Sequence, residues 1–204
     1  MKTRTTTINP AGYLRQVVIH RDARAYWISP GSSIDTFRQN ILIREVCPDD
    51  AEDIVCILNP IIESGAYTVL DSPVTVDLER EFIKSFPKRG LFYVAQDKQS
   101  RKIIGFQNVE PFATYTNAFY HVGIVATYVD HSYRKQGVGR CLAEVVFENA
   151  GIKRYEKLFT YVRADNAGAL AFYSKLGFRI VGTARKQARI GQKYIDEIII
   201  EKFL

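Results

Sequence analysis

Residues 130–140 read Asp-His-Ser-Tyr-Arg-Lys-Gln-Gly-Val-Gly-Arg, and the predicted fold extends outward from this stretch. The apolar, β-branched run 122–129 precedes it, and apolar residues at helical spacing follow it up to residue 150. This pattern predicts a strand, a glycine-bearing turn and the start of a helix. Gly137 and Gly139 lack a Cβ, so a ligand can approach the backbone and meet the free N–H groups of the first helical turn.

The charge of this turn favours an anion. Arg134, Lys135 and Arg140 surround a predicted helix N-terminus, a combination that suits a diphosphate better than a single carboxylate. The spacing is not Gly-x-Gly-x-x-Gly, because Leu142 stands at the third position after Gly139, and Gly-Lys-Ser/Thr is absent from the sequence. By itself the turn indicates an anion site without naming the ligand, and a plain strand-to-helix turn remains the alternative.

Length and composition favour a single soluble domain with a core. The chain has 204 residues, 47% of them hydrophobic, and no apolar run approaches the ~18 residues that cross a bilayer. Three widely spaced cysteines, Cys47, Cys56 and Cys141, are predicted to be buried reduced thiols. No Cys-x-x-Cys or His-x-x-x-His pair occurs, so no metal is expected, and the expected location is cytoplasmic.

Residues 1–40 differ from the rest of the chain. They hold six Lys and Arg against two Asp, lack a sustained period, and contain no apolar segment of the kind found in secretory signals. We predict an N-terminal extension, partly ordered or flexible, ahead of a domain at 41–204. The alternative is that the apolar residues between 17 and 27 pack as an added strand.

The order of elements predicts an α/β sandwich with a mixed sheet of about six to seven strands and about four helices. A charged run at 185–189 is interpreted as a solvated loop. Predicted strands cover 41–46, 91–96, 103–109, 122–129, 158–162, 180–183 and 194–203; predicted helices cover a stretch after Pro48 that ends by Gly65, then 76–86, 138–150 and 166–176.

Two stretches together resemble the GCN5-related N-acetyltransferase (GNAT) superfamily. Residues 134–139 match its acyl-CoA motif Arg/Gln-x-x-Gly-x-Gly/Ala at each position, and residues 166–178 are similar to its later helix motif. The two motifs occur in the expected order and in the predicted structural context, and the resemblance covers residues 41–204.

The resemblance implies acetyl-CoA as co-substrate. Its pyrophosphate would bind backbone N–H groups of residues 136–140, and its pantetheine arm would lie between strands 122–129 and 157–162. Tyr173 occupies the position of the usual general acid, which protonates the departing thiolate; a core aromatic is the alternative reading. The implied cofactor-binding residues are Val129, Arg134, Lys135, Gln136, Gly137, Val138, Gly139, Arg140 and Asn166.

Residues 57–65, Thr68 and residues 72–75 resemble the phosphinothricin and methionine-sulfoximine acetyltransferase subgroup more closely. The chain departs from that subgroup at three places. Ile124 stands where the subgroup has glutamate, residues 113–117 carry no arginine, and Tyr173 stands where histidine is common. These departures argue against an acidic amino-acid substrate.

The general base is left open by the sequence. An alkylammonium of pKa near 10 must lose a proton before it attacks a thioester. His121 lies three residues from Ile124 and has suitable chemistry, and Glu110 and Glu63 are alternatives. Each of the three also has a purely structural reading.

The predicted function is transfer of acetyl from acetyl-CoA to a primary amine of a small molecule, by direct attack in a ternary complex. Acetylation of a protein or peptide amine is the alternative enzyme reading. A non-catalytic acyl-CoA-binding module is the alternative suggested by Ile124. No nucleic-acid partner is expected, because basic and aromatic residues are not interleaved on one face, and no membrane partner is expected, because no apolar run is long enough to cross a bilayer. The resemblance suggests a homodimer.

Overall fold

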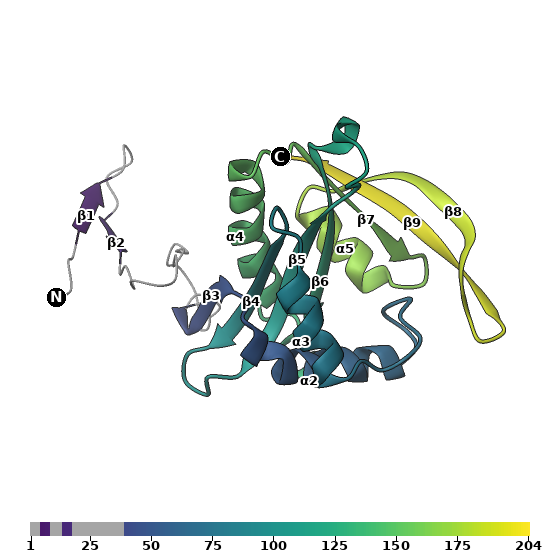
Figure 1. Cartoon of the computed structure of the whole chain (residues 1–204), viewed down its shortest axis with the longest axis horizontal. Helices are drawn as coiled ribbons and strands as arrows, with labels where there is room; N and C mark the ends of the chain where they lie inside the picture. The colour runs from purple at the N-terminus through teal and green to yellow at the C-terminus, as the bar shows by residue number, and fades with distance from the viewer. Residues whose placement is uncertain (1–4, 9–13, 18–38) are drawn as a thin grey trace.

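The computed structural model describes residues 5–8, 14–17 and 39–204. Strands β1 (Thr5–Ile8) and β2 (Leu14–Val17) pair antiparallel with each other. Apart from these two strands and residues 39–40, the predicted extension at residues 1–40 lies outside the described residues. Residues 39–204 form one α/β unit, in which seven strands make a single sheet with the order β3-β4-β5-β6-β7-β9-β8 (Figure 1).

The predicted fold class is confirmed. The strands of the sheet are β3 (Ile41–Glu45), β4 (Leu91–Asp97), β5 (Ile103–Pro111), β6 (Val122–Val129), β7 (Lys157–Arg163), β8 (Arg179–Ile190) and β9 (Lys193–Phe203). The α-helices of this unit are α2 (Ala51–Glu63), α3 (Val76–Ser85), α4 (Val138–Ile152) and α5 (Ala167–Lys175). Short 3-10 turns η1 (Pro48–Asp50), η2 (Asn117–Phe119) and η3 (His131–Tyr133) complete the connections.

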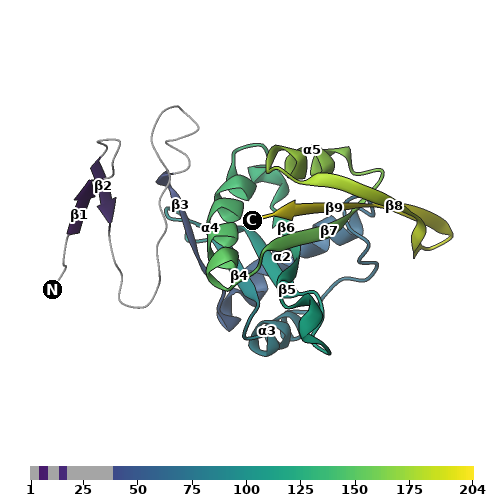
Figure 2. The same cartoon turned by 90° about the horizontal axis from the view of Figure 1, so that it is seen from above.

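Strands β6 and β7 form the parallel pair in an otherwise antiparallel sheet. The direction follows from the connection, because α4 carries the chain from the end of β6 back to the start of β7. Neighbouring strands β3 to β6 and the β8–β9 hairpin run antiparallel. The parallel pair therefore lies inside the sheet, with α4 crossing one of its faces (Figure 2).

Two apolar cores cover the two faces of the sheet. One core joins α4 and α5 to the strands and includes Leu142, Val146 and Tyr173. The other joins α2 and α3 to the opposite face and includes Ile54 and Phe92. Helix α2 has its buried apolar residues at helical spacing on one side, which faces the sheet, so the sheet lies between two helical layers.

Two predictions are corrected. The charged run 185–189 belongs to strand β8 rather than to a loop, because its backbone continues the pairing with β9 through a register shift between Ala184 and Ala188. Cys47 and Cys56 are exposed, and Cys141 is the buried cysteine. Cys56 belongs to α2 but, unlike its neighbours Val55 and Ile57, it is not part of the buried face.

No helix in the part of the chain that the structure describes is long and apolar enough to cross a membrane. Within the same residues, no group of three or more His, Cys, Asp or Glu side chains is arranged to hold a metal ion.

Candidate active site

The parallel strands separate in the middle of the sheet. Strands β6 and β7 pair at three positions, the last of them between Ile124 and Phe159. Beyond that pair β6 continues for five residues to Val129 and β7 for four residues to Arg163. The backbone N–H and C=O groups on the facing edges are then available to bond an extended ligand, as unpaired strand edges do, except for the Val129 carbonyl, which accepts from Arg134 Nε.

The chain after β6 presents a helix N-terminus at the open end of this strand pair. The Asp130 carboxylate accepts a bond from the Ser132 N–H and starts η3, and Gly137 (φ +93°) precedes α4 in the left-handed conformation. The Cys141 N–H donates to the Gly137 carbonyl and closes the first turn. The N–H groups of residues 138–140 therefore have no partner inside the helix and are available to an anion.

The cationic side chains of the turn are partly held by other protein groups. Arg134 Nε donates to the Val129 carbonyl at 3.3 Å, and its guanidinium lies 4.3 Å from the centre of the Tyr67 ring. Arg140 Nε donates to Glu144 at 2.8 Å on the exposed surface of α4. The backbone, rather than these two side chains, thus offers the more directed contacts for a diphosphate.

Packing also explains why a glycine stands at position 139, in addition to the predicted close approach of a ligand. A Cβ at this position would lie 3.0 Å from Cε2 of Phe172 and 3.1 Å from its Cζ. Glycine therefore lets α5 pack directly against the first turn of α4. The sequence indicated only a close approach by a ligand.

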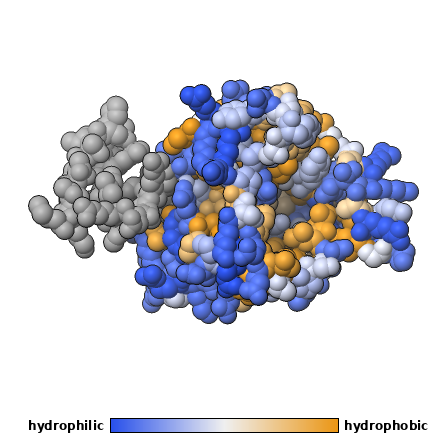
Figure 3. Space-filling model, viewed as in Figure 1, coloured by the Kyte–Doolittle hydropathy of each residue, from blue (hydrophilic) through white to orange (hydrophobic). Residues whose placement is uncertain are grey.

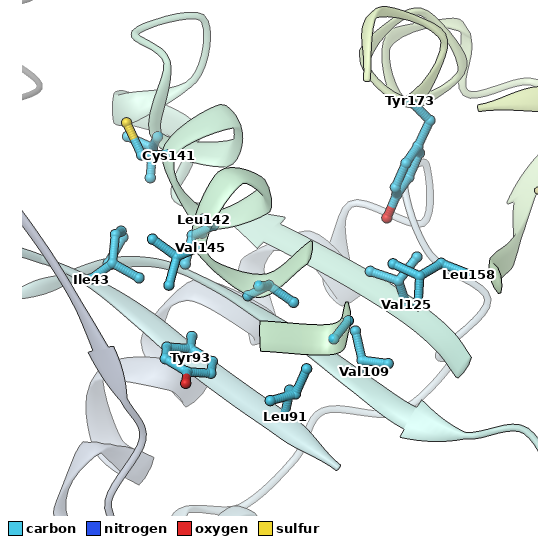
Figure 4. Close-up of a cluster of buried hydrophobic side chains, with 14 of the residues drawn as sticks. Ile43, Leu91, Tyr93, Val109, Val125, Cys141, Leu142, Val145, Leu158 and Tyr173 are labelled. Atoms are coloured by element: carbon cyan, nitrogen blue, oxygen red, sulfur yellow. The ribbon is translucent and has the colours of Figure 1, made fainter. Parts of the chain in front are cut away.

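Tyr173 lies on α5 and projects toward the separated strands, where Figure 4 shows its hydroxyl pointing to the side of the sheet that carries Val125 and Leu158. Its Oη is 3.0 Å from Oγ1 of Thr127 on β6, beyond the last β6–β7 pair. Gln107 Nε2 donates to the same Thr127 Oγ1 at 2.7 Å. Burial raises the pKa of the Tyr173 phenol above its usual value, and the bond with Thr127 opposes that rise.

The loop between α2 and α3, residues 64–75, is fastened to the end of β7. The Arg163 side chain is 4% exposed, and its Nη1 donates to the carbonyls of Gly65 (2.7 Å) and Thr68 (2.9 Å). The same guanidinium makes a two-bond pair with Asp165, which lowers the pKa of that carboxyl to about 2. Arg163 was missed in the sequence because a lone arginine in a strand carries no motif.

Asn166 has two structural roles. Its Oδ1 accepts from the Ala169 N–H and caps α5, and its Nδ2 donates to the Tyr67 carbonyl at 3.2 Å. It therefore joins the helix that carries Tyr173 to the α2–α3 loop. Figure 3 shows hydrophobic residues gathering near this loop, beside the β8–β9 hairpin, and Tyr67, Val69 and Leu70 of the loop are exposed.

The three candidate bases lie in different places. His121 is exposed and precedes the first residue of β6; its backbone carbonyl accepts from the N–H groups of Glu156 and Lys157. Glu63 is exposed at the end of α2. Glu110 is half-buried on β5 and stands directly opposite Ile124 in the antiparallel register; burial raises the pKa of its carboxyl.

A mixed sheet with a separated parallel pair, a helix N-terminus at its open end and a phenol beside the gap in pairing is the arrangement expected of an acyl-CoA-dependent acyltransferase. The chain belongs to the GNAT acetyltransferases, since the family model described as an acetyltransferase (GNAT) domain matches residues 43–199. The protein is accordingly an acetyl-CoA-dependent N-acetyltransferase.

Relatives place it near the phosphinothricin acetyltransferases. The chain is 25% identical to phosphinothricin N-acetyltransferase of Streptomyces coelicolor over 162 residues, which are 74% of this chain and 91% of that protein. It is 29% identical to mycothiol acetyltransferase of Amycolatopsis mediterranei over 171 residues, 79% of this chain, and spans about half (52%) of that protein.

A solved structure has the same fold. The phosphinothricin acetyltransferase of Sinorhizobium meliloti in complex with acetyl-CoA superposes with a TM-score of 0.74 at 16% identity, covering 81% of this chain and 89% of that one.

Proposed function

We propose that the protein transfers the acetyl group of acetyl-CoA to a primary amine of a small molecule, by direct attack of the amine on the thioester in a ternary complex. The observation that carries the proposal is the position of Tyr173. Its hydroxyl bonds Thr127, three residues beyond the last paired residue of β6, on the strand edge that is free to bond the cofactor arm.

In this proposal the turn at residues 129–140 holds the diphosphate through the N–H groups of residues 136–140, and Tyr173 is the general acid. The amine nitrogen attacks the thioester carbon, the carbon–sulfur bond then breaks, and the Tyr173 hydroxyl gives its proton to the sulfur. A phenol of raised pKa stays protonated throughout the neutral range, which suits a proton donor.

Glu110 is the base that the geometry favours. Residues directly opposite in an antiparallel pair have Cβ atoms about 5 Å apart and face the same side of the sheet. Glu110 therefore places a carboxylate next to Ile124, where the related subgroup has its glutamate. Ile124 is three residues from Thr127, about 10 Å along the strand, and successive side chains alternate between the two faces of a strand, so Glu110 approaches the gap in pairing from the face opposite Tyr173. His121 is six residues from Thr127, about 20 Å along the strand.

A small acceptor is favoured over a peptide by the anchored loop. Gly65 and Thr68 are bonded to Arg163 of β7, and Asn166 is bonded to Tyr67. A loop fastened at three carbonyls leaves little freedom to open for a long chain. Two relatives, phosphinothricin and mycothiol acetyltransferases, are named for small-molecule acceptors, whereas relatives that match a shorter part of the chain are named for the alanine of ribosomal protein bS18.

An amine panel tests the proposal. CoA release is followed with alkylamines, amino acids and short peptides for the wild type and for Tyr173→Phe, Glu110→Gln and His121→Gln, with Glu63→Gln as the matched carboxylate control. General acid or base groups each contribute about 10²–10⁴-fold, so Tyr173→Phe and Glu110→Gln are expected to lose at least about 100-fold in kcat. Glu63→Gln and His121→Gln are expected to stay within about threefold of the wild type, because His121 is exposed about 20 Å along the strand from Thr127 and Glu63 is exposed at the end of α2.

Binding is measured separately from turnover. At 100 times its Kd, acetyl-CoA adds about 2.7 kcal/mol to the stability of the native state, and a clear rise in the melting temperature is expected. No rise at millimolar acetyl-CoA would refute the cofactor site. Normal binding without turnover of any amine would favour the acyl-CoA-binding module, and loss in His121→Gln but not in Glu110→Gln would move the base to His121.

A further inference from the structure

A chain of three polar side chains crosses the apolar core under α4 and α5. Gln107 on β5 is the register partner of Thr127 on β6, and Thr127 meets Tyr173 of α5. Gln107 is fully buried, Tyr173 is 6% exposed, and Val109 and Val125 of the same two strands are fully buried. Such a chain inside a core is unusual enough to need a reason, because apolar side chains would pack there without hydrogen-bond requirements.

The direction of these hydrogen bonds follows from the chemistry of the groups. An amide nitrogen only donates, so Gln107 Nε2 occupies a lone pair of Thr127 Oγ1 and leaves the threonine hydrogen unused. Thr127 can therefore donate that hydrogen to Tyr173 Oη, 3.0 Å away. With its oxygen accepting from Thr127, the tyrosine keeps its own hydrogen for another acceptor.

The opposite orientation of the Gln107 amide would reverse the direction of both hydrogen bonds. If Oε1 of Gln107 faced Thr127, it would take the threonine hydrogen, and Thr127 would then be left to accept from Tyr173. The tyrosine hydrogen would be consumed inside the protein. In the structure Oε1 instead faces away from Thr127 and is a buried acceptor without a hydrogen-bond partner among the described residues.

We propose that Gln107 and Thr127 are positioning residues for the acetyl transfer, which turn the hydroxyl hydrogen of Tyr173 toward the sulfur of the thioester. The proposal rests on the proposed function, in which Tyr173 is the general acid. Neither residue touches the reacting atoms; both act through Tyr173. The chain of donors runs from Gln107 to Thr127, from Thr127 to Tyr173, and from Tyr173 to the leaving sulfur.

The proton balance of the step is complete. The nitrogen–carbon bond forms, the carbon–sulfur bond breaks with its electron pair going to sulfur, and the sulfur takes the proton of Tyr173 to give the free thiol. The proton that the amine loses goes to the base, and the phenolate regains a proton from solvent. Thr127 stays a donor to the phenolate oxygen while the negative charge is present, which is when its hydrogen bond is strongest.

The hydrogen bond from Thr127 also offsets the effect of burial on the acidity of the Tyr173 phenol. Desolvation raises the pKa of Tyr173, which makes it a weaker acid, and the hydrogen bond with Thr127 acts in the opposite direction. A buried phenol without that donor would give up its proton less readily. Thr127 thus sets both the direction of the Tyr173 hydrogen and the ease of its transfer.

A double-mutant cycle tests the proposal with the acceptor amine found in the panel. Thr127→Val keeps the shape of threonine but removes its hydroxyl, and we expect kcat to fall about tenfold or more with the KM for acetyl-CoA unchanged. In the Tyr173→Phe background the same Thr127→Val change is expected to cause no further loss, because its effect passes through the missing hydroxyl. Thr127→Ser restores a hydroxyl and is expected to stay within about threefold of the wild type.

Gln107→Met gives a second, independent variant. It removes the donor to Thr127 and also the unpartnered Oε1, so we expect a lower kcat with an unchanged or higher melting temperature. A variant that merely damages packing would have both a lower kcat and a lower melting temperature. The acetyl-CoA-induced rise in melting temperature, measured on each variant, shows that the cofactor site is intact.

The outcomes separate this proposal from the one on which it rests. If Tyr173→Phe keeps the wild-type kcat, the acid assignment itself fails. If Tyr173→Phe is impaired but Thr127→Val and Gln107→Met are not, the positioning role is overturned while the acid assignment stands. The positioning role would also be overturned if Thr127→Val lowered kcat by the same factor in the wild type and in the Tyr173→Phe background. Additive effects would mean that Thr127 does not act through the Tyr173 hydroxyl.

Discussion

Replacing Arg163 by methionine would release the α2–α3 loop from the end of β7. The side chain is 4% exposed, and its Nη1 holds two loop carbonyls, those of Gly65 and Thr68. Each hydrogen bond from a charged donor contributes about 1.5–3 kcal/mol. The pair with Asp165 adds less than about 1 kcal/mol, because that carboxylate is 43% exposed and is solvated when the arginine is gone.

We therefore expect Arg163→Met to lower the free energy of unfolding by about 3 kcal/mol, after the methionine recovers part of the burial. For a chain of this size each kcal/mol corresponds to about 2–4 °C, so the melting temperature should fall by about 6–12 °C. Because the freed loop is proposed to border the acceptor, the KM for the amine should rise about tenfold, equivalent to 1.4 kcal/mol, with the KM for acetyl-CoA within about threefold.

Arg44→Met is the matched control. Arg44 makes a similar two-bond pair with Asp50, at 2.6 and 2.7 Å, but it lies on β3 at the opposite edge of the sheet from β8. It is separated from β7 by four strand spacings, about 19 Å. This variant should lose stability without a change in either KM. The reasoning is refuted if Arg163→Met loses less than about 1 kcal/mol or if both arginine variants raise the amine KM equally.

Two further predictions concern stability. Gly123→Ala should lower the free energy of unfolding, measured by urea denaturation, by about 1–3 kcal/mol, because a Cβ would lie 2.6 Å from Cγ1 of Val109. Gly151→Ala is the control: this position lies in open space on α4, and the alanine should stabilise the protein by about 0.5–1 kcal/mol. Equal effects of the two substitutions would exclude the steric cause. The carboxyl pKa of Asp165 is lowered to about 2 by Arg163, so its contribution is present above pH 3.8 and is lost as pH falls through 2. The urea midpoint of the wild type should fall more steeply between pH 5 and 2 than that of Asp165→Asn, and parallel curves would contradict this.

The local elements were predictable because their signals are local. The bounds of β6 agree with the apolar run 122–129, and α4 begins at Val138, immediately after the glycine that allows a positive φ. Helix α5 begins after its Asn166 cap, as the side-chain chemistry of that residue predicts. Strand β8 was underestimated, because its long charged half has no apolar alternation and is set by pairing with β9.

The sequence by itself predicted the strand, glycine turn and helix start that are proposed to hold the cofactor, since these elements are contiguous and their backbone geometry depends on neighbouring residues. The setting of the residues proposed as the base, the acid and the loop anchor was decided only by the tertiary structure. Glu110 faces Ile124 because of strand register, Gln107 reaches Thr127 across the same pair of strands, and Arg163 bonds a loop about a hundred residues earlier in the chain. Such contacts join residues that carry no motif, and pairing and packing bring them together.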